Sequence, residues 1–103
     1  MKKQFGEEQY FEDFAVGDEF EAGPVTFSED EIVEYAKQFD PQRFHTDVEF
    51  AKNHFYKGLI ASGFHVLSKT ACALVKAGFL RGGGMGSPGL DTLRWKKPVR
   101  PGD

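Results

Sequence analysis

The sequence predicts a small α+β domain, because two helical segments lie between two strand-like ones. Helical spacing of apolar residues begins after Ser28, and a longer apolar helix is predicted from Gly63 to Ala77. The segments Glu19–Phe27 and Leu90–Lys97 have the character of strands. A chain of 103 residues has room for one core, so residues 1–103 are expected to form a single domain.

The composition limits the classes of function. The chain is 40% hydrophobic and 28% charged, as is typical of a soluble globular protein. Its formal net charge is -3, and no concentrated basic patch points to nucleic acid as a partner. No run approaches the roughly 20 apolar residues of a membrane helix, and no apolar run follows Lys2 and Lys3 as in a secretory leader. Cys72 is the only cysteine, so we expect a cytoplasmic protein without an internal disulfide.

The first strand and first helix have clear boundary signals. A Gly17-Asp18 turn precedes the strand Glu19–Phe27, in which Gly23-Pro24 predicts a bend. Ser28 and Glu31 form a capping box, in which each side chain binds the backbone N–H of the other. Pro41 disfavours a helical conformation of the residue before it, so this helix is expected to end at Asp40.

The second half of the chain is organised around one apolar helix. Residues 41–57 are predicted to be a loop with a short helical turn at Val48–Lys52. Gly63–Ala77 is apolar nearly all round, which predicts a buried helix, with Ser62 as N-cap and Gly78 as C-cap. Arg81–Gly84 is predicted to be a flexible link, followed by the strand Leu90–Lys97 and a turn at Pro98–Asp103.

Asp40 and His45 are the candidate catalytic residues. A loop carboxylate and a loop histidine are most often only solvated polar groups. Here Pro41 restrains Asp40, and Phe39 and Phe44 flank the pair with apolar surface that could exclude water. A carboxylate and an imidazole that bind one water make a general acid/base pair.

Ser62 and Gly63 are the second half of this candidate site. They begin the apolar helix, where backbone N–H groups without intrahelical partners can stabilise an oxyanion. Activated water beside an oxyanion site suits the hydration of an activated double bond or the hydrolysis of a thioester. The spacing of these residues leaves both reactions open.

The remaining reactive residues give weaker signals. His65 is expected to be a buried histidine satisfied by a hydrogen bond, and His54 an exposed loop residue. Asp47, His45 and His54 match no common metal-ligand spacing, and we expect neither a metal nor a cofactor. A basic cluster near the end of the chain could line the mouth of a site for a phosphate-bearing ligand: Arg81, Arg94, Lys96, Lys97 and Arg100.

Three segments together resemble one family. FDPQRFHTDVEFAK, GLIASGFH and the ending KKPVRPGD are similar to the MaoC-like dehydratases, which include the (R)-specific enoyl-CoA hydratases. The resemblance extends from about Tyr10 to Asp103. It implies the hot-dog fold, in which an antiparallel sheet wraps a long central helix.

The resemblance also implies roles for the candidate residues. Asp40 and His45 would hold the water that adds to a trans-2-enoyl-CoA, giving an (R)-3-hydroxyacyl-CoA. The Gly63 N–H would bind the thioester oxygen, and Ser62 would support the helix start. Asp47 resembles a second loop acid of the family that we interpret as structural. Many members have Asn-Pro in this loop, whereas here Pro41 directly follows Asp40.

Family members continue past the Pro-Gly-Asp turn with about three more strands and form dimers. We therefore expect a domain that lacks its C-terminal strands and associates into a homodimer or higher homo-oligomer. Two other hypotheses stay open: a hot-dog acyl-CoA thioesterase, and a non-catalytic truncated subunit that binds acyl thioesters. Chain length and branching of the acyl group, and CoA as against a carrier protein, are not encoded in these motifs.

Overall fold

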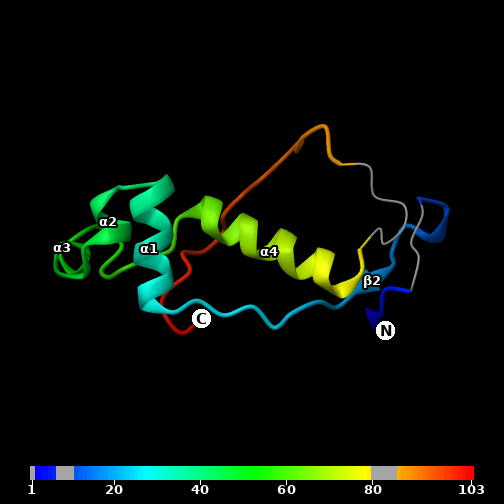
Figure 1. Ribbon diagram of the computed structural model, residues 1–103, viewed down its shortest axis with the longest axis horizontal. Helices are drawn as coiled ribbons and strands as arrows, with labels where there is room; N and C mark the ends of the chain where they lie inside the picture. The colour runs from blue at the N-terminus through cyan, green and yellow to red at the C-terminus, as the bar shows by residue number, and fades with distance from the viewer. Residues whose placement is uncertain (1, 7–10, 80–85) are drawn as a thin grey trace. The chain divides into compact units, whose positions relative to one another are not determined.

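The computed structural model describes residues 2–6, 11–79 and 86–103. Contacts within the chain divide it into two compact units. Unit 1 contains residues 1–25 and 70–92, and unit 2 contains residues 26–69 and 93–103. Helix α4 (Gly63–Ala77) contributes its first turns to unit 2 and its last turns to unit 1 (Figure 1). The predicted link Arg81–Gly84 lies outside the described residues, as do residues 80 and 85.

Helix α1 (Glu29–Phe39) begins and ends where its sequence predicts. The Ser28 hydroxyl accepts the Glu31 N–H at 3.2 Å, and the Glu31 carboxylate accepts the Ser28 N–H at 3.2 Å. These two bonds are the capping box. Asp40 is the C-cap, and its N–H donates to the carbonyl of Ala36 at 2.8 Å.

Two short helices replace most of the predicted loop. Helix α2 (Arg43–Thr46) was not predicted, because four residues are too few to show helical periodicity. Helix α3 (Val48–Lys52) confirms the predicted helical turn. Asp47 caps α3 by accepting the Phe50 N–H at 3.0 Å, which agrees with its structural interpretation.

Helix α4 begins and ends where its sequence predicts. Gly78 has φ 108, and its N–H and that of Phe79 return to the carbonyls of Val75 and Leu74, each at 3.0 Å. Glycine adopts this left-handed conformation without steric cost. At the other end, Ser62 directly precedes the helix as predicted, and its carbonyl accepts the Val66 N–H at 3.1 Å. The bond found for its hydroxyl is not a cap of this helix but a hydrogen bond donated to Asp40 at 2.8 Å. The start of α4 is thereby tied to the end of α1.

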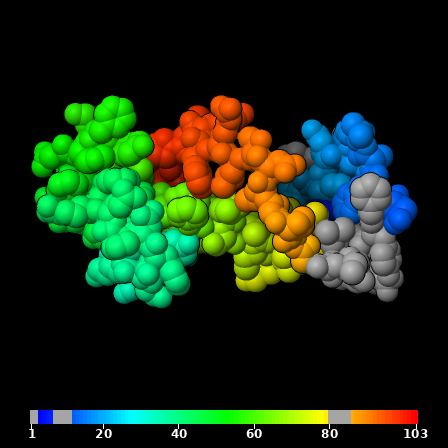
Figure 2. Space-filling view, turned by 90° about the horizontal axis from the view of Figure 1, so that it is seen from above, coloured from blue at the N-terminus to red at the C-terminus, as the bar shows by residue number. Residues whose placement is uncertain are grey.

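The buried core lies in unit 2. Its apolar members are Phe27, Ile32, Ala36, Ala51, Leu59, Ile60 and Ala61. The final segment of the chain packs against the start of α4, where the Ala61 N–H donates to the Val99 carbonyl at 2.8 Å (Figure 2). Phe27 and Gly102 are joined by a hydrogen bond of 2.8 Å that anchors the predicted turn at Pro98–Asp103. This packing holds the residues of the candidate site between α1, α2 and α4.

Unit 1 contains the described strands. Strands β1 (Lys2–Lys3) and β2 (Glu19–Phe20) pair in parallel, and η1 (Phe11–Asp13) is a single 3₁₀ turn. The rings of Phe5 and Phe20 stack with centroids 4.5 Å apart. Lys3 forms an ion pair of 2.8 Å with Asp18, which also accepts the Ala15 N–H in the predicted turn at Gly17.

The predicted strands are wrong in extent. Only Glu19–Phe20 of the segment Glu19–Phe27 is a strand, and no residue of Leu90–Lys97 is one. A strand exists only where a neighbour supplies ladder hydrogen bonds. In the described part of the chain, the only such pair is β1 with β2, which is parallel. The antiparallel sheet expected around the central helix is therefore not formed by these residues.

Helix α4 is also more exposed than its apolar sequence predicts. His65 is its only buried residue among those described, while Phe64 is 59% and Val75 71% exposed. Cys72, on the same helix, is exposed as well. Burial of such a helix requires a sheet across its apolar faces, and the two-residue strands are too short to provide one. The described helices include none that is long and apolar enough to cross a membrane.

Candidate active site

Asp40 occupies the point where α1 ends and the chain turns into α2. Its side chain is 16% exposed, and Pro41 follows it directly. The Oδ1 atom accepts a hydrogen bond from the Gln42 amide at 2.8 Å, and Oδ2 accepts one from the Ser62 hydroxyl at 2.8 Å. These two bonds fix the orientation of the carboxylate.

His45 is held on α2 with one ring nitrogen facing Asp40. The ring is buried, and its Nδ1 lies 2.8 Å from the Ile60 carbonyl oxygen. Because a carbonyl can only accept, Nδ1 carries the proton of this hydrogen bond. In the neutral imidazole Nε2 is therefore the basic nitrogen, and it lies 3.3 Å from Asp40 Oδ2. A water that lies beside these two acceptors, on the cavity side, can donate a hydrogen bond to each.

The surroundings of Asp40 favour its ionised form. Burial raises the pKa of the Asp40 carboxyl, but hydrogen bonds from Gln42 and Ser62 and the nearby His45 ring together outweigh this effect. The pKa of Asp40 consequently lies below its usual 3.8. At neutral pH the Asp40 side chain is thus a carboxylate, and it faces the His45 ring.

Gly63 brings the start of α4 to the same place. It is the first residue of α4, so its N–H has no acceptor within the helix. Among the described residues no acceptor for this N–H is found elsewhere either. Ser62, which precedes it, is fully buried and joined to Asp40.

A cavity of about 270 Å³ in unit 2 connects these groups. Asp40, His45 and Gly63 all line it. Gln42 and Lys97 are the polar members of the rest of the lining. The other lining residues are apolar or aromatic: Phe44, Tyr56, Ala61, Phe64, Val66, Trp95, Pro98 and Val99. The four predicted site residues are therefore neighbours, three of them at the cavity wall and Ser62 directly behind Asp40.

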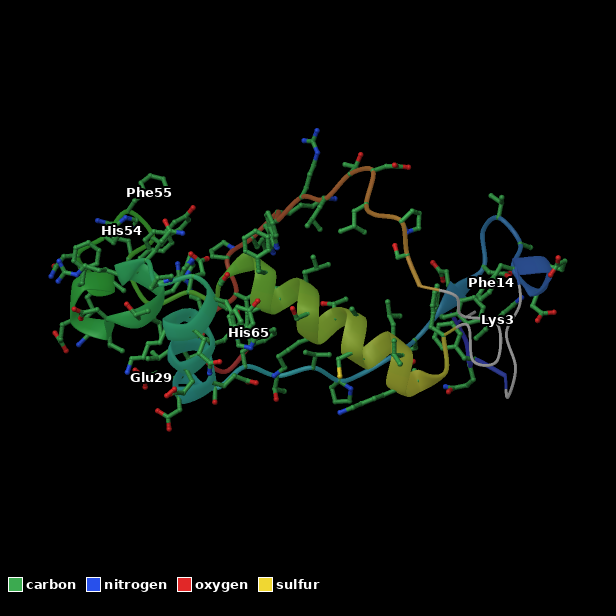
Figure 3. The ribbon with its side chains drawn as sticks, turned by 45° about the horizontal axis from the view of Figure 1, so that its top comes forward. Lys3, Phe14, Glu29, His54, Phe55 and His65 are labelled. Carbon is green, nitrogen blue, oxygen red and sulfur yellow. The ribbon has the colours of Figure 1, made fainter. Side chains whose placement is uncertain are left out.

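His65 belongs to a separate cluster on the first turns of α4, next to α1 (Figure 3). Its ring stacks on Tyr35 with centroids 4.4 Å apart, and Nε2 lies 3.8 Å from Glu31. Lys69 binds both carboxylate oxygens of Glu31 at 2.8 Å and also donates to the Thr26 carbonyl. His65 is buried as predicted, but its Nδ1 has no partner among the described residues.

Charge and burial shift two pKa values in this cluster. Burial lowers the pKa of His65 below its usual 6.5, and the nearby Glu31 only partly opposes this. The hydrogen bond from Lys69 is the main reason that the pKa of Glu31 lies below 4.5. The cluster joins α1 to α4 and lines no part of the cavity.

Two predictions about the surroundings of the site need correction. Phe39 is 67% exposed and does not line the cavity, so of the two flanking rings only Phe44 shields the pair. His54 is half-buried and stacks on Phe44 at 4.7 Å, whereas an exposed loop residue was predicted. Packing between aromatic rings in a loop leaves no periodic signal in a sequence.

The predicted basic cluster is only partly at the cavity. Lys97 lines it, whereas Arg100 donates to the Tyr56 carbonyl at 2.6 Å. Arg94 and Lys96 are exposed and do not line it, and Arg81 lies outside the described residues. In the described ranges no three His, Cys, Asp or Glu side chains cluster as metal ligands would.

Three contributors to the site were not identified from the sequence. Gln42 binds Asp40, the Ile60 carbonyl orients His45, and Trp95 donates its indole N–H to the Gly63 carbonyl at 3.0 Å. Trp95 is the only tryptophan, which was the one available signal. A backbone carbonyl carries no signal at all, because every residue has one.

Comparison with known proteins defines the class. The family described as "MaoC like domain" matches residues 12–103. The crystal structure of a MaoC-like dehydratase from Rhodospirillum rubrum matches with a TM-score of 0.82 and 40% identity, over 92% of this chain and 64% of that one. The uncharacterized protein YdeM of Bacillus subtilis (strain 168) is 30% identical over 92 residues, or 89% of this chain and 65% of that protein.

The chain therefore belongs to the MaoC-like domain family, as its motifs predict, and this membership implies the hot-dog fold. The chain spans a little less than two thirds of the length of both relatives.

Proposed function

We propose that this chain hydrates trans-2-enoyl thioesters of CoA to (R)-3-hydroxyacyl thioesters, reversibly. The observation that supports this most strongly is the distance of 3.3 Å between His45 Nε2 and Asp40 Oδ2 at the wall of a cavity that Gly63 also lines. Membership of a family that contains a dehydratase agrees with a hydro-lyase activity.

In the proposed reaction a water lies in the cavity beside Asp40 and His45, within hydrogen-bond distance of both. As its oxygen bonds to the β-carbon, the water proton moves to His45 Nε2, and the C=C electron pair moves toward the thioester oxygen. The Gly63 N–H donates to this oxygen while it carries enolate charge. The imidazolium then returns a proton to the α-carbon, so one water is added and the protein ends unchanged.

Each neighbour has a part in this proposal. The Ile60 carbonyl keeps the proton of His45 on Nδ1, which leaves Nε2 free to act as a base. Ser62 and Gln42 keep Asp40 ionised and oriented. The apolar lining suits an acyl chain, and Lys97 offers a positive charge to the phosphates of CoA. Assembly into a homodimer or larger homo-oligomer, and a cytoplasmic location, are part of the same proposal.

The test is the loss of enoyl absorbance from crotonyl-CoA, followed beside free-thiol release. The parent is expected to lose absorbance without releasing thiol. Asp40→Asn should lower kcat by about 10²- to 10⁴-fold, because the water loses its charged acceptor. Asp30→Asn, on the exposed face of the same helix, is the matched control and should retain the parent rate.

Thiol release in step with the loss of absorbance would instead indicate a thioesterase, because hydrolysis also ends the conjugation of the double bond with the thioester. Binding of crotonyl-CoA with neither reaction would indicate a non-catalytic subunit. Either result contradicts the proposed hydration.

A further inference from the structure

The indole of Trp95 lies directly against Gly63. A Cβ atom at position 63 would lie 2.4 Å from Trp95 Cε2, 2.6 Å from Cζ2 and 2.8 Å from Nε1. Real Cβ atoms essentially never approach other atoms so closely. The glycine at the start of α4 is thus required by the ring packed on it, not by an unusual φ.

A hydrogen bond fixes the orientation of this ring. The Nε1–H of Trp95 donates to the Gly63 carbonyl at 3.0 Å. An indole N–H can only donate, and a carbonyl oxygen has a second lone pair besides the one that serves its helix. The ring therefore fills the space beside the Gly63 Cα and also binds the Gly63 carbonyl through its only polar atom.

Trp95 is also part of the cavity. It lines the cavity together with Asp40, His45 and Gly63, and it is 48% exposed. The ring of Phe64 meets it edge-on at 6.0 Å. A tryptophan whose role was only to fill a core would be far more buried. Trp95 instead leaves about half of its surface exposed at a site that it also lines.

We infer that Trp95 is a positioning residue for the oxyanion-binding N–H: its indole holds the first turn of α4 so that the Gly63 N–H faces the cavity. This inference rests on the proposed function, because it names the residue that supports the Gly63 N–H in the proposed reaction. It adds a residue outside the Asp40, His45, Ser62 and Gly63 set.

The first experiment removes only the indole N–H. Because Trp95 is the sole tryptophan, biosynthetic replacement by benzothienylalanine changes this site alone and exchanges the N–H for sulfur while keeping the ring shape. We expect kcat for crotonyl-CoA hydration to fall about 10-fold with KM changed less than about threefold, because misplacing a group at the reacting centre affects the transition state most. An unchanged kcat in an active parent overturns the inference and leaves the proposed function intact.

The second experiment is a double-mutant cycle of Gly63→Ala and Trp95→Ala. With Trp95 present, Gly63→Ala should reduce kcat/KM at least about 100-fold, since the new methyl group displaces the ring and the helix start together. With Trp95→Ala already made, the same change should cost less than about threefold, because the space is then free. Equal losses in both backgrounds overturn the inference.

The cycle is also read by urea unfolding, which does not depend on turnover. An inactive parent contradicts the proposed function, and the role of Trp95 in it. In that case the shifts of the unfolding midpoint still decide whether the two residues are paired: non-additive shifts support the pairing and additive ones overturn it.

Discussion

Ser62 connects the two halves of the site at the level of a single side chain. It is fully buried, and its hydroxyl donates to the same Asp40 oxygen that faces His45. A hydrogen bond to a carboxylate stabilises the charged form and so lowers its pKa. The sequence indicated Ser62 as a helix cap, because Ser before an apolar helix has that role most often.

Ser62→Ala should therefore raise the pKa of Asp40. Its pH–rate profile for crotonyl-CoA hydration is expected to lose activity at a higher pH than that of the parent on the acid side. Loss of a buried hydrogen bond should also lower the free energy of unfolding by about 1–2 kcal/mol. Ser68→Ala is the control, because Ser68 is an exposed residue of the same helix that binds only the Phe64 carbonyl among the described residues.

An acid limb that stays in place in Ser62→Ala would contradict the role assigned to this hydroxyl, even if the variant is less stable.

His65 predicts a second pH effect, on stability. Its pKa in the folded chain lies below the usual 6.5, so the unfolded chain binds a proton more readily. The stabilisation is therefore complete above pH 6.5 and is lost as the pH falls through the folded pKa. Glu31 from α1 and Lys69 from α4 are the charged groups that act on the ring. The carboxylates Glu31 and Asp40 also have lowered pKa values, so their stabilisation is lost only below pH 4.5 and pH 3.8.

His65→Phe keeps a ring against Tyr35 but cannot titrate. Urea unfolding from pH 7 down to about pH 5 should show the parent losing stability relative to this variant. Parallel curves over that range would exclude His65 as the titrating group.

Helix α1 positions Asp40, and its capping box is the feature that sequence reasoning identified best. Both bonds of the box and the end at Asp40 follow from local rules, since the cap side chains and Pro41 act on their immediate neighbours. Glu31 has a further role that no local rule predicts, because its partner Lys69 is 38 residues away.

Ser28→Ala should lower the free energy of unfolding by about 1 kcal/mol through loss of the cap. The measurement is the urea midpoint, and Ser28→Thr, which keeps a hydroxyl at the cap, should recover most of the loss. Ser87→Ala removes an exposed hydroxyl that binds only Gly89 among the described residues, and it should leave the midpoint unchanged. An equal loss in both alanine variants would argue against the capping box.

Other elements were harder to predict. Helix α2, which carries His45, has four residues and no periodicity. The strands at 19–27 and 90–97 were inferred from residue types alone, but a strand depends on a partner that the segment itself does not encode. The exposure of α4 has the same origin. Its apolar pattern indicates that the helix can bury its surface, but it does not indicate which residues, if any, cover that surface.

For the whole chain, the family and the proximity of the four site residues could both be reached from the sequence, through three quoted segments that match one family. The distances between residues far apart in the chain could not be predicted from the sequence. That Trp95 lies on Gly63, 32 residues away in sequence, depends on how the final segment packs in unit 2. Among the described residues, the buried apolar side chains all lie in unit 2, as do the four site residues.

The measurement that tests the central claim most directly is the rate at which His45→Gln hydrates crotonyl-CoA, compared with the parent and with His54→Gln. His54 is a histidine of the same loop region that does not line the cavity. Loss of the basic Nε2 should reduce kcat by at least about 10²-fold in His45→Gln, while His54→Gln should stay within about threefold of the parent. Parent-like hydration by His45→Gln would contradict the account, because the water would then be activated elsewhere.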